Sequence, residues 1–160
     1  MKIKSMKGVK VNLQVGEFVE FTGWSSNREF NEYWEYTFGL DIKKIIIVED
    51  DPDAATYLDA LMSKIYPEAL ILVAKSPEEA RSLFNSAPFD LAIVDFILSD
   101  TVTGLDLCQE IHERNPEAKL VIVSAINSYQ FHDLAESARI IPDFIEKPIT
   151  VDKLRQHLDL

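Results

Sequence analysis

The sequence predicts an α/β fold in which five parallel strands form a doubly wound sheet with helices on both faces. Two observations from residue 44 onward lead to this prediction. Short apolar runs alternate with segments of helical periodicity, and charged side chains follow the ends of several runs. Uninterrupted apolar runs are typical of strands buried on both faces. Their alternation with helices predicts parallel pairing through right-handed crossovers.

Five runs are expected to form the strands: Lys44–Val48, Leu70–Ala74, Asp90–Asp95, Lys119–Ser124 and Asp143–Glu146. Signals for helix starts follow each of them. Asp51 and Thr150 are capping residues, and Pro52 suits a first helical position. Residues 76–79, Ser-Pro-Glu-Glu, form a capping box, and two further helices are expected after Gly104 and near Ser128–Arg139.

Helical spacing also predicts which side chains face the sheet. In the first helix these are Ala54, Leu58, Leu61, Met62 and Ile65, in the second Ala80, Leu83 and Phe84, and in the third Leu105, Cys108 and Ile111. The fourth helix is expected to present Phe131, Leu134, Ala135 and Ala138, and the last Val151, Leu154 and Leu158.

Residues 1–42 are expected to form a separate N-terminal extension ahead of a domain covering residues 43–160. Val9–Val15 and Glu17–Thr22 alternate in polarity around Gly16 and predict a hairpin, and an aromatic-rich helix is expected after residues 26–29. Both tryptophans and eight of the sixteen aromatic residues lie in this extension. A hairpin and one helix can hardly bury that much surface alone, so we expect an interaction segment that contacts the domain or another chain.

Composition excludes several classes of protein. No apolar run approaches the roughly 20 residues of a membrane span, and the basic N-terminus lacks the apolar stretch of a secretory signal. Cys108 is the only cysteine, which predicts a small core residue in a cytoplasmic protein. The net charge is −11, and residues 44–160 hold twenty-one acidic and ten basic side chains. An acidic domain is poorly suited to bind nucleic acid.

Charged side chains at the ends of three predicted strands indicate a site. Glu49 and Asp50 follow the first strand, Asp95 ends the third, and Lys147 follows the fifth. Ligands of α/β sheets collect at the carboxyl ends of the strands. Two carboxylates about 4 Å apart repel by roughly 4 kcal/mol at an effective dielectric constant near 20. The predicted cluster therefore needs a cation, and oxygen ligands of this kind suit Mg²⁺.

Four segments resemble the response-regulator receiver domain of two-component signalling over about residues 43–160. They are Ile46–Pro52 (IIVEDDP), Leu91–Asp95 (LAIVD), Val121–Ala125 (VIVSA) and Phe144–Pro148 (FIEKP). The resemblance implies the flavodoxin-like (βα)5 fold. It also implies a protein that takes a phosphoryl group from a sensor histidine kinase or a histidine phosphotransfer protein and acts on an unknown downstream partner, with a homodimer as an option.

The resemblance assigns the acidic residues. Asp95 matches the phosphoryl acceptor, and Asp50 and Asp95 match direct ligands of Mg²⁺. Glu49 is expected to act on the metal through water, and the backbone carbonyl of Ile97 is implied as a further ligand. A shifted register, in which Asp50 and Asp51 form the acidic pair, remains an alternative.

The resemblance also assigns three residues around the acceptor. Lys147 matches the lysine that contacts the phosphoryl group, and its bond to Pro148 is expected to be cis. Ser124 matches the residue that donates a hydrogen bond to that group, and Phe144 matches the switch aromatic that moves between exposed and buried positions. The loop Phe96–Thr103 departs from the family pattern, with one residue more than expected before Gly104.

The leading hypothesis is therefore a Mg²⁺-dependent receiver that signals by a conformational switch and is not an enzyme in its own right. A phosphorylation-independent docking module is the alternative. A phosphohydrolase with an aspartate nucleophile is disfavoured, because Ile97 stands where such enzymes need a second acid. No glycine-rich nucleotide loop occurs, so no organic cofactor is expected.

Overall fold

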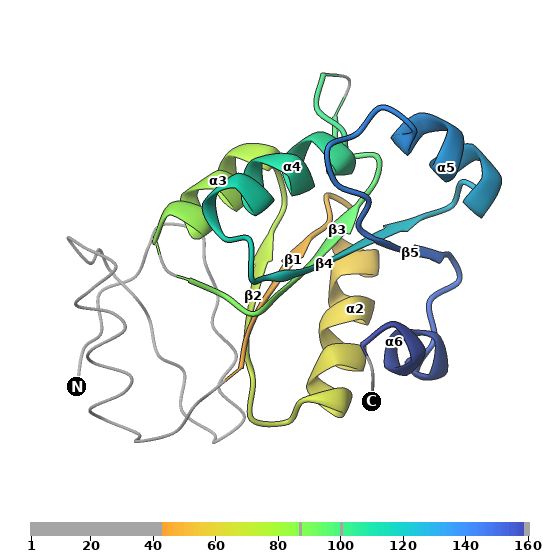
Figure 1. The fold of residues 1–160 in the computed structure, drawn as a ribbon. Coiled ribbons are helices and arrows are strands. Elements are labelled where there is room, and N and C mark those ends of the chain that lie inside the picture. The colour runs from red at the N-terminus through yellow and green to blue at the C-terminus, as the bar shows by residue number, and fades with distance from the viewer. Residues whose placement is uncertain (1–42, 87, 100, 159–160) are drawn as a thin grey trace.

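Five parallel strands form the sheet of this protein in the order β2-β1-β3-β4-β5 (Figure 1). The structure, a computed structural model, describes residues 43–86, 88–99 and 101–158. The strands are β1 (Lys44–Val48), β2 (Leu70–Ala74), β3 (Leu91–Asp95), β4 (Lys119–Ser124) and β5 (Asp143–Glu146). The expected parallel fold is confirmed. The hairpin and helix expected within residues 1–42 lie outside the described residues.

Helices cover both faces of the sheet (Figure 1). They are α2 (Pro52–Ile65), α3 (Pro77–Ser86), α4 (Gly104–Arg114), α5 (Ser128–Ala135) and α6 (Val151–His157). Side chains of α2 and α6 share one buried cluster with the sheet, and side chains of α3, α4 and α5 share the other. Across the residues that the structure describes, no helix is both long and apolar enough to cross a membrane.

Alternation along each strand divides the core between the two faces. Ile45 and Ile47 of β1 belong to the cluster with α2 and α6, whereas Ile46 and Val48 belong to the opposite cluster. All four side chains are at most 2% exposed. Cys108 is fully buried in α4, and burial raises the pKa of its thiol to about 12. The two apolar layers hold the sheet rigid and so fix the edge where the charged residues lie.

Four expectations about element boundaries and faces need correction. The helix expected near Ser128–Arg139 ends at Ala135, because the amide of Ala138 donates to the Ala135 carbonyl in a turn. Leu134, which still lies within the helix, is 57% exposed instead of buried. In the first turn of α2 the buried alanine is Ala55, and Ala54 is only partly buried. Strand β3 begins one residue later than expected, at Leu91.

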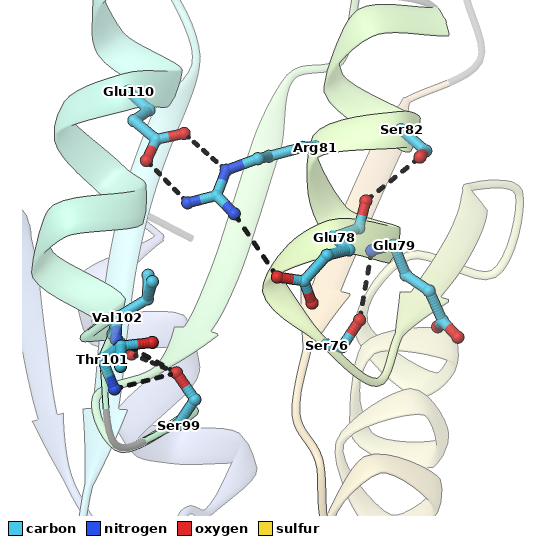
Figure 2. Close-up of polar contacts among 9 residues, drawn as sticks. All are labelled: Ser76, Glu78, Glu79, Arg81, Ser82, Ser99, Thr101, Val102 and Glu110. Atoms are coloured by element: carbon cyan, nitrogen blue, oxygen red, sulfur yellow. Dashed lines mark hydrogen bonds and ion pairs between the residues drawn. The ribbon is translucent and has the colours of Figure 1, made fainter.

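The loop after β3 is closed by contacts near both of its ends. Ile97 and Thr103 form an isolated antiparallel bridge, and the Ser99 hydroxyl accepts from the amides of Thr101 and Val102 (Figure 2). The Gly104 amide then donates to the Phe96 carbonyl at 2.8 Å. The loop therefore returns to the strand end, and α4 starts directly beside the backbone of Asp95.

A two-bond ion pair joins α3 to α4. The Arg81 guanidinium donates to both carboxylate oxygens of Glu110 at 2.8 Å and lies 3.7 Å from Glu78 (Figure 2). The hydrogen bonds from Arg81 are the main cause that lowers the pKa of the Glu110 carboxyl. The side chains of Arg81 and Glu110 are 34% and 40% exposed, so water screens the attraction.

We predict that Arg81→Met lowers the free energy of unfolding by about 0.5 kcal/mol at neutral pH. A carboxyl whose folded pKa is lowered contributes stability above its unfolded pKa and loses it as the pH falls through the folded value. The difference between wild type and variant should therefore begin to shrink as the pH falls below about 4.3, the ordinary glutamate value, and vanish only below the lowered folded pKa. Urea titrations at several pH values measure this, with Arg155→Met on α6 as the matched control. A pH-independent difference would contradict the prediction.

Candidate functional site

The carboxyl ends of β1 and β3 bring two acidic side chains together. The strands are parallel neighbours, with Val48 opposite Val94. Glu49 follows β1 and Asp95 ends β3, so both emerge at the same edge of the sheet. Glu49 is 1% exposed and Asp95 is 7% exposed. Because β1 lies between β2 and β3, this edge is the point at which the strand order reverses, where α/β folds bind ligands.

Lys147 bridges the two buried carboxylates. Its Nζ lies 3.0 Å from an oxygen of Glu49 and 2.8 Å from Oδ2 of Asp95. The other oxygen of Asp95 accepts from the amide of Ile97 at 3.3 Å. Lys147 follows β5, and its amide donates to the Ser124 carbonyl at 2.7 Å. Residues almost a hundred positions apart are thus held in one charged cluster.

Asp50 completes a group of three carboxylates. One oxygen from each of Glu49, Asp50 and Asp95 lies within 4.8 Å of the others. Asp50 is exposed, so the group opens to solvent on its side. Asp51 instead accepts from the Ala54 amide at 2.8 Å and caps α2, as expected. The cluster thus contains the pair Glu49 and Asp50, and the shifted pair Asp50 and Asp51 is not favoured.

Burial and charge act in opposite directions on the pKa values of this cluster. Burial is the largest cause that raises the pKa of the Glu49 carboxyl, and the nearby Asp95 raises it further, against the hydrogen bond from Lys147. For Lys147, burial works to lower the pKa, but the hydrogen bonds and attraction from Asp95 and Glu49 raise it overall. The lysine therefore stays protonated and acts as the internal counterion of the acidic group.

Ser124 lies along the same edge, between the strands that carry Asp95 and Lys147. It follows Val123, the residue opposite Asp95, and pairs with Glu146 of β5. Its side chain is fully buried, and its hydroxyl accepts from the amide of Ile126 at 3.3 Å. The Lys147–Pro148 peptide bond is cis, as the resemblance implied.

Phe144 of β5 is part of a row of three aromatic rings. It is stacked on Phe131 of α5, with ring centroids 4.4 Å apart and planes 10° from parallel. Phe131 is fully buried and also meets Phe96, the residue after Asp95, edge to face at 6.1 Å. Phe144 itself is half-buried and packs against the apolar cluster that contains Phe131.

Sequence reasoning missed two side chains that contact the segment carrying Lys147. They are Tyr57 of α2 and Lys153 of α6, and both donate to backbone carbonyls. A backbone carbonyl can accept a hydrogen bond whatever the side chain of its residue is. Contacts of this kind therefore produce no recognisable sequence motif. The one signal was Lys153 itself, a cation in the first turn of a helix, where acidic residues are favoured.

We predict that Lys147→Met lowers the free energy of unfolding by about 2 kcal/mol in the absence of divalent cations. The substitution leaves Glu49 and Asp95 buried and facing each other without a positive charge. The effect should fall below the roughly 3–5 kcal/mol seen when fully buried pairs are broken, because the Lys147 side chain is 28% exposed. Urea denaturation in a chelating buffer measures it, and Lys64→Met on α2 is the control. Equal losses in the two variants would contradict this.

Comparisons with known proteins agree with this geometry. The sequence matches the response regulator receiver domain family over residues 45–159. Response regulator protein PilR of Pseudomonas aeruginosa is 32% identical over 114 residues, which cover 71% of this chain and 25% of PilR. Transcriptional regulatory protein CitT of Bacillus subtilis is 30% identical over 115 residues, covering 71% of this chain and 50% of CitT. The chain thus spans no more than half the length of these relatives.

Solved structures share the fold. A CheY-like receiver domain from Methanospirillum hungatei JF-1 has a TM-score of 0.64 at 22% identity, covering 74% of this chain and 92% of that one. The response regulator TrrA from Thermotoga maritima, solved in complex with Mg²⁺ and BeF, has a TM-score of 0.61 at 24% identity, covering 74% and 97%. With five parallel strands, the charged cluster at their carboxyl edge and a family match over most of its length, this chain belongs to the response regulator receiver domains of two-component systems.

Proposed function

We propose that this receiver takes a phosphoryl group onto Asp95 from a histidine of a sensor kinase or phosphotransfer protein in the cytoplasm. The observation that supports it most is the position of Asp95. Its carboxylate lies at a strand end, nearly buried, with Lys147 at 2.8 Å and two further carboxylates beside it. Phosphoryl transfer depends mainly on positioning and charge neutralisation, which this arrangement supplies.

The transfer exchanges one bond to phosphorus for another. A carboxylate oxygen of Asp95 forms the new oxygen–phosphorus bond, and the nitrogen–phosphorus bond of the donor histidine breaks. The departing imidazole keeps the electron pair and is protonated. Lys147 stays within reach of the acceptor and faces the negative charge of the transferred group. Ser124 is the candidate hydrogen-bond donor to a phosphoryl oxygen.

The carboxylates fit the preference of Mg²⁺ for oxygen ligands. Asp50 and Asp95 are the proposed direct ligands, the Ile97 carbonyl is a third, and Glu49 acts through water. Bound Mg²⁺ would neutralise charge on the phosphoryl oxygens and on the acidic cluster. TrrA, with its Mg²⁺ and BeF, supports the assignment by analogy.

Incubation of the purified chain with phosphoramidate tests the proposal. With Mg²⁺ present, the intact mass should increase by one phosphoryl group, and a chelator should prevent the increase. Borohydride reduction followed by peptide mapping should place the label on Asp95. A label on another residue, or none with Mg²⁺ present, would contradict the proposal. Absence of any label would favour the phosphorylation-independent docking module.

We also propose that residues 1–42 form an interaction segment attached to a receiver domain covering residues 43–160. The supporting observation is compositional: half of the aromatic residues lie in this segment. Light scattering should show a smaller assembly, or a weaker complex with a downstream protein, after deletion of residues 1–42. An unchanged mass and unchanged binding would contradict this role.

A further inference from the structure

The segment that carries Lys147 is short and lies between β5 and α6. Lys147 follows Glu146, the last residue of β5, and Thr150 caps α6 three residues later. The amide of Lys147 is held by the Ser124 carbonyl at 2.7 Å. The position of the Lys147 ammonium therefore depends on how the remaining backbone of residues 146–149 is held.

Lys153 holds this segment from α6. Its Nζ donates to the Glu146 carbonyl at 2.8 Å and to the Pro148 carbonyl at 2.9 Å, one on each side of Lys147. Hydrogen bonds from an ammonium are among the stronger ones in proteins. The two bonds fix the direction in which the backbone passes through Lys147.

The place of Lys153 in its helix supports a specific role. It is the third residue of α6, where the positive end of the helix dipole disfavours a cation. Its own amide contributes to the cap by donating to the Thr150 hydroxyl at 3.2 Å, which any residue other than proline could do at this position. The contacts to Glu146 and Pro148 are what the lysine side chain adds.

Tyr57 holds the same segment from α2. Its hydroxyl donates to the Ile149 carbonyl at 3.0 Å, although the residue is 51% exposed. α2 and α6 cover the same face of the sheet, so the two donors approach the segment from neighbouring helices. The carbonyls of Glu146, Pro148 and Ile149 thus all accept from side chains outside the segment.

We infer that Lys153 and Tyr57 are positioning residues that fix the backbone of residues 146–149 and so hold the Lys147 ammonium against Asp95. The inference rests on the proposed function for its effect on phosphoryl transfer. The Lys147 ammonium must stay within hydrogen-bond reach of Asp95 to face the incoming group. A displacement of about 1 Å can cost up to a hundredfold in rate, so a partial release of this segment should be measurable.

The first arm of the test measures the rate of labelling by phosphoramidate at saturating Mg²⁺. Lys153→Met, which keeps the stem but removes the donors, should slow labelling about three- to tenfold, and Tyr57→Phe about twofold. Lys153→Arg keeps a cationic donor with several N–H groups within reach of both carbonyls and should restore most of the rate. Arg155→Met, which removes an exposed cation from the same helix, is the matched control and should label like wild type.

The second arm does not depend on phosphorylation. Hydrogen exchange of the Lys147 amide, followed by NMR, reports how firmly its bond to the Ser124 carbonyl is held. Exchange should be about three- to tenfold faster in Lys153→Met and unchanged in Arg155→Met. Thermal unfolding of both variants checks that neither loses global stability.

The combined results decide the inference. Slower labelling with faster Lys147 exchange, both reversed by Lys153→Arg, supports it. Wild-type labelling in Lys153→Met overturns it, as does slowing that Arg155→Met shares or that Lys153→Arg fails to restore. If wild type takes no label, the proposed function fails separately and the exchange arm decides alone. Unchanged exchange would then overturn the holding role, and faster exchange would support it.

Discussion

The Asp95→Asn variant is expected to take up no phosphoryl group under conditions that label wild type. An amide oxygen is a poor nucleophile, whereas a carboxylate can form the acyl phosphate. The substitution keeps the shape of the side chain and leaves one oxygen to accept from Lys147, so the fold should be retained. Intact mass after incubation with phosphoramidate and Mg²⁺ measures the uptake, and circular dichroism confirms folding.

Asp53→Asn is the matched control for this loss. It removes the same charge from an exposed position in the first turn of α2, close in sequence to the acidic pair. The control should be labelled at the wild-type rate. Labelling of the Asp95→Asn protein would rule out Asp95 as the phosphoryl acceptor. Absence of label on the Asp53→Asn protein would show that loss of any nearby negative charge is enough to prevent phosphorylation.

Gly104→Ala is expected to have the largest effect on stability, a loss of about 3 kcal/mol in the free energy of unfolding. A Cβ at this position would lie 2.1 Å from the carbonyl oxygen of Asp95 and 2.9 Å from its carbonyl carbon. Both are backbone atoms in the centre of the sheet edge, so the start of α4 must move. Alanine favours a helix by about 1 kcal/mol over glycine, which offsets only part of this cost.

Urea denaturation at neutral pH measures the effect of Gly104→Ala. Ser128→Ala is the control, since it places alanine at the first position of α5 on an exposed site and should change stability by less than about 0.5 kcal/mol. The Gly104 variant should also label more slowly, because the displaced backbone carries the acceptor. A Gly104 variant as stable as wild type would show that the loop adjusts freely.

Much of the fold could be predicted from the sequence, because buried parallel strands leave continuous apolar runs. The bounds of β1, β2, β4 and β5 match the expected runs, since each run ends at or just before a charged or small polar residue. The end of α5 could not be found in this way. Ala138 keeps helical spacing with Phe131 and Leu134, so the apolar periodicity continues past Ala135 although the helix does not.

The candidate site could be predicted as a group of residues but not as a set of contacts. The motifs placed Glu49, Asp50, Asp95 and Lys147 at one edge, and the structure brings them together. The sequence does not show that Lys147 contacts Glu49 as closely as Asp95. The sharing of one cation between two buried carboxylates depends on the lateral spacing of β1, β3 and β5. The spacing between strands of a sheet is not encoded in any local sequence pattern.

We propose that the stacking of Phe144 on Phe131 sets the starting balance of the conformational switch that the resemblance assigned to Phe144. An outward rotation of Phe144 would forfeit an aromatic contact of about 0.5–1.5 kcal/mol and uncover one face of a fully enclosed ring. That free energy corresponds to a roughly two- to tenfold preference for the inward arrangement before any signal arrives. A receiver built in this way already favours one of its two states before any signal arrives. A modest stimulus is then enough to complete the change, and the disadvantage is some signalling activity in the resting state.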